Sequence, residues 1–305
     1  MTTTLCETST RALTAGDLDR VAGIDAAASG RPRRGFYAKR FAALAEDPRS
    51  IVGIAAERDG CTVGFAFAQV LDGEFGGTAP AGHLDAIGVA PAARGEGVAR
   101  ALLGALEAEL RERGVRELRT QIEWTEHGMA AFFSASGFQL SSRLVLERSI
   151  EKPTSDNFTW EELPVRSMNE GDLPAIIRLD RKITGRDRTG YYRRKGAEVL
   201  RQSGVRVSQV AELDGQFAGF LMARVDFGEF GRTEPTAILD TIAVDPAFVR
   251  RHVARALLEQ LLLNLRSLRV ERLVTEAEWD HLDLLGFLAS TGFEHSQRLA
   301  FVKAV

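Results

Sequence analysis

The sequence is poor in cysteine, carries no excess of positive charge and has no long hydrophobic run. Its 305 residues include two cysteines, Cys6 and Cys61, too few for a disulfide framework or a four-cysteine zinc site, and we expect a reducing, cytoplasmic environment. The 39 lysines and arginines stand against 42 aspartates and glutamates, a net charge of −3. Bulk charge therefore gives no reason to expect nucleic acid or an anionic membrane as a partner.

Signals for export or membrane insertion are also missing. No window approaches the roughly 18 uninterrupted apolar residues that a transmembrane helix needs. The N-terminal residues MTTTLCETSTR lack the basic start and apolar stretch of a secretory signal. With 45% hydrophobic and 27% charged residues, the composition is that of a soluble globular protein. At roughly 100–200 residues per domain, the length predicts two domains.

The chain contains an internal duplication. Shifted by 155 residues without a gap, residues 11–148 match residues 166–303 at 52 of 138 positions. Two long matching units indicate a duplicated domain rather than a solenoid of many short repeats. We therefore expect a first domain at residues 1–150, an irregular linker at 151–160 and a second domain at 161–305.

Each unit mixes helical and strand periodicity. The elements expected in the first unit are, in order, a helix starting at 16–18, a hairpin over 51–71 with its turn at Asp59-Gly60, a strand over 84–89, a helix over 98–113, a strand over 115–123, a short helix over 129–136 and a last strand over 140–148. This order predicts an α/β (mixed α+β) fold, in which a mixed sheet carries helices on its faces.

The most informative stretch is IGVAPAARGEGVARALL, residues 87–103. A strand runs into a short loop that holds Arg94, Gly95 and Gly97, and an amphipathic helix follows at once. Glycines let the backbone approach a ligand with no Cβ in the way. A helix N-terminus offers unpaired N–H groups and the positive end of its dipole, so the loop predicts a phosphate or pyrophosphate site. No GK[ST] follows, and the spacing is not the dinucleotide GxGxxG.

This loop resembles that of a known family. The pattern V-x-P-x-x-R-G-x-G-x-A over residues 89–99 is similar to the acyl-CoA pyrophosphate loop of the GNAT (GCN5-related) N-acetyltransferase superfamily. FFSASGF at 132–138 resembles that family's aromatic-x-x-x-Gly-Phe segment. The resemblance spans nearly all of each unit. It implies two tandem GNAT domains, each a twisted, mostly antiparallel sheet with a splayed parallel strand pair, and acetyl-CoA as co-substrate.

The resemblance also implies where acetyl-CoA binds in the first unit. Pantetheine is expected along the backbone of Ile87, Gly88 and Val89, with the thioester between this strand and the strand over 118–124. The pyrophosphate is expected on the loop and the first turn of the helix, at Arg94, Gly95, Glu96, Gly97, Val98 and Ala99.

The second unit departs from this pattern. Its loop reads FVRRHVA, so Arg250 and His252 stand at the positions of Gly95 and Gly97. Side chains there crowd the phosphates and make a positive φ costly, although Arg250 and Arg251 could offer charge to phosphate. We expect a degenerate second loop, with catalysis in the first unit; a functional variant loop is the alternative.

Acetyl transfer needs a neutral amine, a group or water chain that takes its proton, and a way to protonate the departing thiolate. Many GNAT enzymes use a tyrosine for the last task, four residues before the glycine of the C-terminal segment. Phe133 and Leu288 occupy that position here. The usual acid is absent from both units, and a thiolate can leave with little help because thiols are fairly acidic.

Acidic side chains recur at matching positions in the two units. By period-two alternation Asp85 lies on the strand face of Ile87 and Val89, and a carboxylate in an apolar strand is costly unless it is paired or functional. We consider Asp85 and Glu123 as catalytic candidates, with a structural role as the alternative because the second unit keeps both. Candidate acceptor contacts are Glu74, in a hairpin loop, and Trp124, beside Glu123.

Arg31, Arg33 and Tyr37 also recur in the second unit. In GNAT proteins the segment after the first helix borders the acceptor pocket, so these residues could bind an acceptor that bears a carboxylate. Solvated arginines at a helix–loop junction are the alternative. The five histidines occupy unaligned positions without metal-ligand spacing, so we expect no metal site.

The sequence thus predicts an acetyl-CoA-dependent N-acetyltransferase that acts on a primary amine, either of a small molecule or of a protein lysine, with catalysis in the first domain. A non-catalytic acyl-CoA-binding or sensing module is the alternative, suggested by the missing tyrosine. A third hypothesis is a scaffold whose duplicated domain only supports dimerisation. We expect the two domains to pair within the chain, and a homodimer stays open.

Overall fold

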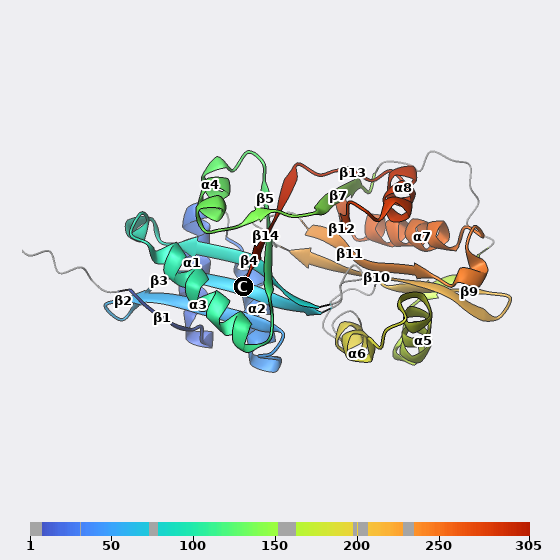
Figure 1. Cartoon of the computed structure of the whole chain (residues 1–305), viewed down its shortest axis with the longest axis horizontal. Coiled ribbons are helices and arrows are strands. Elements are labelled where there is room, and N and C mark those ends of the chain that lie inside the picture. Colours follow the sequence, from blue (N-terminus) through green and yellow to red (C-terminus); the bar gives the residue numbers. More distant parts are fainter. Residues whose placement is uncertain are drawn as a thin grey trace, which may run out of the picture.

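The computed structural model describes residues 8–30, 32–72, 79–151, 163–197, 200, 207–227 and 235–305. Within these residues, two sheets of seven strands follow one another along the long axis of the molecule (Figure 1). All neighbouring strands are antiparallel except for one parallel pair in each sheet. The predicted fold, two tandem domains with mixed and mostly antiparallel sheets, is confirmed.

The first sheet has the strand order β1 (Ser9–Ala12), β2 (Ile51–Arg58), β3 (Cys61–Asp72), β4 (Pro80–Val89), β5 (Glu117–Glu123), β14 (Arg298–Ala304) and β6 (Gln139–Leu140). The helices of this half are α1 (Leu18–Ser29), α2 (Arg34–Glu46), α3 (Val98–Glu112) and α4 (His127–Ala135).

The second sheet repeats this plan. Its order is β13 (Glu294–His295), β7 (Arg143–Ser149), β12 (Arg272–Glu278), β11 (Pro235–Val244), β10 (Gln216–Phe227), β9 (Gln209–Leu213) and β8 (Val165–Ser167). The helices are α5 (Leu173–Thr184), α6 (Thr189–Ala197), α7 (Val253–Ser267) and α8 (Leu282–Ser290).

Side-chain alternation places a core on each face of the first sheet. Along β3, Ala66 and Ala68 contribute to the core under α3, whereas Phe65 and Phe67 contribute to the core under α1 and α2. The alternation follows the two-residue period of a strand. The hairpin turn was also predicted correctly, since Asp59 has a φ of 50° and joins β2 to β3 in a two-residue turn.

The last strand of each unit lies in the other unit's sheet. The sequence predicts residues 140–148 as the closing strand of the first unit, but the structure divides this segment. β6 stays in the first sheet, whereas β7 pairs along its whole length with β12 of the second sheet. In return, β14 pairs along its whole length with β5 of the first sheet. Both exchanged strands have similar alternating sequences, so local pattern does not decide which sheet each one joins.

Helix α2 was not expected from the sequence. Its buried face includes Phe36, Tyr37 and Phe41 together with the charged residue Arg40, and this charge interrupts the apolar pattern. Strand β4 is also longer than expected, because Gly82 and His83 break the apolar alternation at its start.

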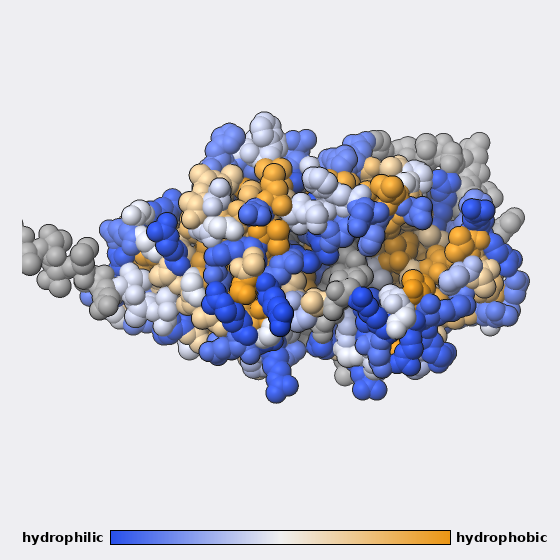
Figure 2. Space-filling view, in the orientation of Figure 1, coloured by the Kyte–Doolittle hydropathy of each residue, from blue (hydrophilic) through white to orange (hydrophobic). Residues whose placement is uncertain are grey.

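The surface is mainly polar on the face shown in Figure 2, and hydrophobic residues gather there in separate patches over the two halves. Within the described residues, no helix is long and apolar enough to cross a membrane.

Candidate active site

Strands β4 and β5 form the parallel pair of the first sheet, and their pairing is short. It ends at His83 and Arg119 along the described length of both strands. Beyond this point the hydroxyl of Thr120 donates a hydrogen bond of 3.1 Å to the carbonyl oxygen of Leu84. In a regular parallel pair of strands, a backbone N–H would donate to this oxygen instead. Residues 85–89 of β4 therefore keep a strand edge without a backbone partner on the β5 side.

The loop after β4 presents a row of backbone N–H groups. Gly95 and Gly97 adopt φ values of 78° and 82°, and α3 begins at Val98. Among the described residues, the amide groups of residues 95–100 donate to no backbone carbonyl. A Cβ built on either glycine meets nothing within 4 Å. Open space in front of free N–H groups at the positive end of α3 fits a pyrophosphate, because its charged oxygens accept hydrogen bonds from such groups.

The charged side chains of this loop are tied to neighbouring strands. Glu96 forms an ion pair with Arg58 of β2. The exposed Arg94 donates through Nε to the carbonyl oxygen of Val89 at 3.2 Å. The pairing of Glu96 offsets the one negative charge within residues 94–97, which favours an anionic ligand.

The second unit builds the same backbone from other residues. Arg250 and His252 have φ values of 66° and 63°, in the left-handed region that costs an L side chain roughly 1–2 kcal/mol. Their Cβ atoms occupy positions equivalent to those that Gly95 and Gly97 leave free. The cost of a positive φ, expected from the sequence, is therefore present in the second loop.

Asp85 does not lie on the strand face that alternation predicts. A β-bulge opposite Phe67 and Ala68 leaves Asp85 without a Cα partner on β3. Ile87 and Val89 pack toward the core under α3, whereas Asp85 turns toward the other face. The extra residue of a bulge shifts the alternation by one position, which is why the period-two prediction is wrong here.

The Asp85 carboxylate is held by side chains from three elements. Its Oδ2 lies 2.9 Å from Nε of Arg40 on α2 and accepts a hydrogen bond of 2.7 Å from Gln69 on β3. Oδ1 lies 3.7 Å from Nδ1 of His83. The side chain is 0% exposed, so it has no direct access to an acceptor from solvent. In the second unit Asp240 is held similarly by Lys195 at 2.8 Å and by Arg224.

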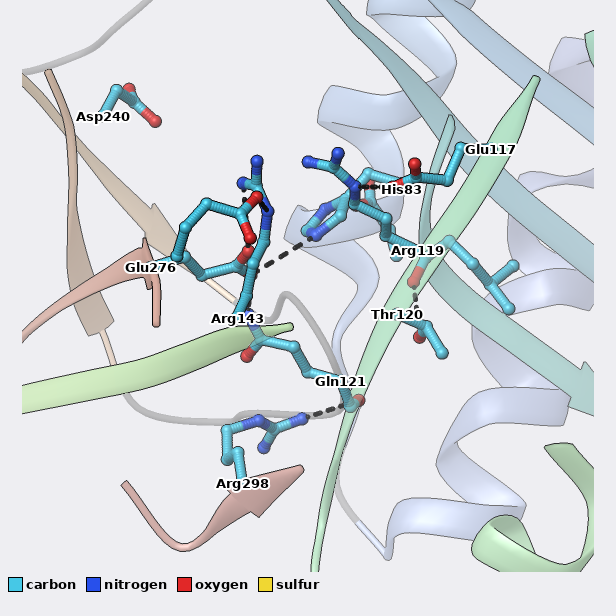
Figure 3. A network of polar contacts seen from close by, with 12 residues as sticks. His83, Glu117, Arg119, Thr120, Gln121, Arg143, Asp240, Glu276 and Arg298 are labelled. Atoms are coloured by element: carbon cyan, nitrogen blue, oxygen red, sulfur yellow. Dashed lines mark hydrogen bonds and ion pairs between the residues drawn. The ribbon is translucent and has the colours of Figure 1, made fainter. Parts of the chain in front are cut away.

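His83 connects this cluster to the second unit. Figure 3 shows Glu276 and Arg143, from β12 and β7 of the second sheet, pointing toward His83. Nε2 of His83 lies 3.8 Å from Oε1 of Glu276, and the same carboxylate accepts a hydrogen bond from Gln121 of β5. Arg143 lies 3.8 Å from the other carboxylate oxygen. A carboxylate of the second unit thus lies where β4 and β5 of the first unit diverge.

Burial and charge oppose each other in this cluster. Burial by itself lowers the pKa of His83, but the contacts with Asp85 and Glu276 outweigh burial and raise that pKa to about 9. Burial raises the pKa of Glu276, but the contact with His83 and the charge of Arg143 lower it to about 2. At neutral pH the pair is an imidazolium and a carboxylate.

The stability that His83 contributes is expected to depend on pH. Because the folded-state pKa of about 9 lies above the ordinary value of 6.5, the contribution is complete below pH 6.5 and is lost as the pH rises through 9. The difference in unfolding free energy between the native protein and His83→Gln should therefore shrink over this range. Urea unfolding of both proteins at about pH 6 and pH 9.5 measures it. A difference that grows with pH would contradict the assignment.

Glu123 and Trp124 lie at the end of β5. Glu123 is 41% exposed and accepts a hydrogen bond of 2.7 Å from Arg298 of β14, itself a buried residue. Trp124 is 52% exposed, and its amide donates to the carbonyl oxygen of Gln297 at 3.0 Å. Both side chains reach the surface beside the diverging strands, which is compatible with the predicted contacts to an acceptor.

Arg33 and Tyr37 are engaged inside the protein. Arg33 pairs with Asp25 of α1 through two nitrogens and lies 3.2 Å from the Tyr37 hydroxyl. Tyr37 is fully buried, and burial raises its pKa far above the ordinary value. These contacts give both residues a place in the α1–α2 packing, and acceptor contact by either stays a prediction. Arg31 and Glu74 lie outside the described residues.

Comparison with known proteins agrees with this geometry. A profile of the acetyltransferase (GNAT) family matches residues 19–138 and, separately, residues 174–293. The chain belongs to the GNAT family. As a member, it is an N-acetyltransferase that uses acetyl-CoA.

Relatives of this GNAT protein include single and tandem forms. Aminoglycoside N(6′)-acetyltransferase type 1 of Stenotrophomonas maltophilia is 34% identical in an alignment 139 residues long that covers 43% of this chain and 91% of that protein. A tandem GNAT protein from the clavulanic acid biosynthesis pathway is 18% identical, with a TM-score of 0.66 over 98% of each chain. A GCN5-related glucosamine N-acetyltransferase region of a fungal multi-domain β-N-acetylglucosaminidase is 14% identical, with a TM-score of 0.66 over 97% of this chain and 38% of that one. The two structures show that the fold is shared.

Two features of the GNAT site bear on the sequence predictions. Phe133, at the position of the usual tyrosine, is buried in the core under α3, with Phe301 of β14 at a ring distance of 6.1 Å. It therefore contributes packing and no proton.

The sequence did not single out His83 or Glu276. The one available signal was that these two positions differ between the repeats. The second repeat has Ile238 at the position of His83, and the first repeat has Gln121 at the position of Glu276.

Proposed function

We propose that the first unit transfers the acetyl group of acetyl-CoA to a primary amine of a small molecule. The observation that carries this assignment is the loop of Gly95 and Gly97, whose free N–H groups face open space. The second loop places the side chains of Arg250 and His252 at the equivalent positions. The aminoglycoside acetyltransferase relative supports a small amine over a protein lysine.

The chain's own groups suggest a division of roles. Asp85 is fully buried and paired with Arg40, so we assign it to holding β4 in position. Glu123 is partly exposed at the end of β5, and it is the better placed of the two candidates to receive a proton from the acceptor amine. When bound, acetyl-CoA supplies the acyl group and the thiolate leaving group. The low cysteine content supports a cytoplasmic location.

The native chain is expected to bind one acetyl-CoA, not two, because the second loop carries the side chains of Arg250 and His252 where the first loop has Gly95 and Gly97. Isothermal titration of the whole chain measures the number of sites. A thiol-release assay with amino sugars, polyamines and a lysine peptide as acceptors measures transfer. Two equivalent sites would contradict a degenerate second loop. Binding without release on any acceptor would contradict the assigned reaction, and release on the lysine peptide alone would contradict a small amine acceptor.

A further inference from the structure

The point where β4 and β5 diverge holds a carboxylate from the other unit. Glu276 of β12 contacts both strands: it lies 3.8 Å from His83 of β4 and accepts a hydrogen bond from Gln121 of β5. All three residues are less than 9% exposed. Figure 3 shows these side chains converging from three strands. Glu276 therefore links the two strands at the start of their separation.

The position of this link matters for the acetyl site. His83 is the last residue of β4 whose backbone pairs with β5, and Gln121 lies two residues beyond the partner of His83. Asp85, in the β-bulge, is the next residue of β4 with a side chain in the cluster. Residues 87–89, which are expected to hold pantetheine, begin two positions after Asp85. A shift of β4 relative to β5 at His83 would therefore move the thioester relative to the acceptor.

Charges alternate along the cluster. Arg40 of α2 pairs with Asp85 of β4, Asp85 faces His83, His83 faces Glu276, and Glu276 faces Arg143 of β7. Removal of one member of a buried ion pair leaves its partner without compensation in a medium of low dielectric constant. The cluster is thus expected to hold a single arrangement, and the neutral forms of His83 and Glu276 should loosen it.

The duplicated sequence does not repeat this ion pair. In the duplicated sequence Ile238 stands at the position of His83, and Gln121 stands at the position of Glu276. An isoleucine cannot form the ion pair. The ion pair therefore joins β12 to β4, beside the loop of Gly95 and Gly97, and no equivalent ion pair joins β5 to β11, beside the loop of Arg250 and His252.

We infer that Glu276 of the second unit is a positioning residue for acetyl transfer in the first unit, acting through His83 and Gln121 to set the separation of β4 and β5. This inference rests on the proposed function of the first unit. It gives the second unit a role in the reaction that does not require it to bind acetyl-CoA.

The test compares Glu276→Gln, His83→Gln and the double variant in the full-length chain, with Glu278→Gln as the control. Glu278 lies on the same strand and pairs with Arg143 at 2.7 Å. Among the described contacts it has no ion pair with β4 or β5, so its substitution removes a neighbouring carboxylate and leaves the link between the units in place. Because small displacements of reacting groups can cost about 100-fold in rate, we expect each single substitution at the link to lower kcat 10- to 100-fold. Acetyl-CoA affinity should stay within about threefold, since the phosphate loop is untouched.

Two further readouts separate positioning from a general loss of stability. The double variant should be no slower than the slower single variant, because residues that act as one unit are not additive. By NMR, the His83 imidazole, identified as the resonance missing in His83→Gln, should titrate at lower pH in Glu276→Gln. If Glu276→Gln unfolds below the assay temperature, the inference is tested with His83→Gln alone. It then requires that this variant has a lower kcat and an acetyl-CoA affinity close to the native value.

The outcomes are distinct. A kcat within twofold of the native value in Glu276→Gln or His83→Gln overturns the inference. It is also overturned if Glu278→Gln lowers kcat as much as Glu276→Gln does, or if the two single losses of kcat multiply in the double variant. These results would leave the proposed function intact. Failure of the native chain itself to bind acetyl-CoA or release thiol would overturn the proposed function and the inference together.

Discussion

Gly97→His is expected to weaken acetyl-CoA binding by at least about 100-fold while leaving the fold intact. The substitution places in the first loop the residue that the second loop carries at the same backbone conformation, with a φ of 63°. A Cβ on Gly97 meets no protein atom within 4 Å, so the imidazole would enter only the space in front of the N–H groups. Loss of two charge-assisted hydrogen bonds, each worth roughly 1.5–3 kcal/mol, corresponds to about two orders of magnitude or more. Calorimetry measures the affinity.

A matched control is available at the other end of the same helix. Gly114 follows α3, has a φ of 76° and also has nothing within 4 Å of a built Cβ. Gly114→His should therefore lower the melting temperature about as much as Gly97→His, through the same backbone strain, and leave acetyl-CoA affinity unchanged. Equal affinity in both variants and the native chain would show that the loop is not the phosphate site.

Phe301→Ala, in β14, is expected to destabilise the sheet of the first unit. Phe301 is 6% exposed and belongs to the core under α3, because β14 lies between β5 and β6 in the first sheet. Truncation of a buried phenylalanine costs roughly 3–5 kcal/mol. Hydrogen exchange followed by NMR should show faster opening of the β5 amides, with a smaller change in β12.

The equivalent substitution in the first repeat should have the opposite distribution. Leu146, on β7, is 6% exposed and belongs to the core of the second unit. Leu146→Ala should therefore speed exchange in β12 more than in β5. If Phe301→Ala loosened β12 and Leu146→Ala loosened β5, each closing strand would lie in its own unit's sheet, and the exchange of strands would be wrong.

Several parts of the site could be predicted because they depend on short segments. The strand, loop and helix over residues 87–103 need only local periodicity and two glycines, and the left-handed conformations of Gly95 and Gly97 are present. The hairpin turn at Asp59-Gly60 is equally local. In contrast, α2 could not be found by periodicity, because the buried Arg40 on its inner face is neutralised by Asp85 on another element.

The roles of the carboxylates depended on contacts between distant segments. Alternation along β4 placed Asp85 beside Ile87, and one extra residue in a bulge reversed that assignment. A bulge is a property of the register between β3 and β4, so the spacing within β4 does not contain it. Glu123 was placed correctly at the end of β5, but its ion pair with Arg298 required knowledge of which strand lies beside β5.

By itself, the sequence determined the duplication, the mixed fold of each unit, the glycine loop that precedes α3 in the first unit and the loss of those glycines from the second. These follow from residue identity and from spacing within one segment. Only the tertiary structure decided the exchange of β7 and β14 and the meeting of His83 with Glu276. The two repeats offer each closing strand a similar partner, so local sequence leaves the pairing undecided. The choice follows from the packing of both sheets together, which brings residues almost 200 positions apart into contact.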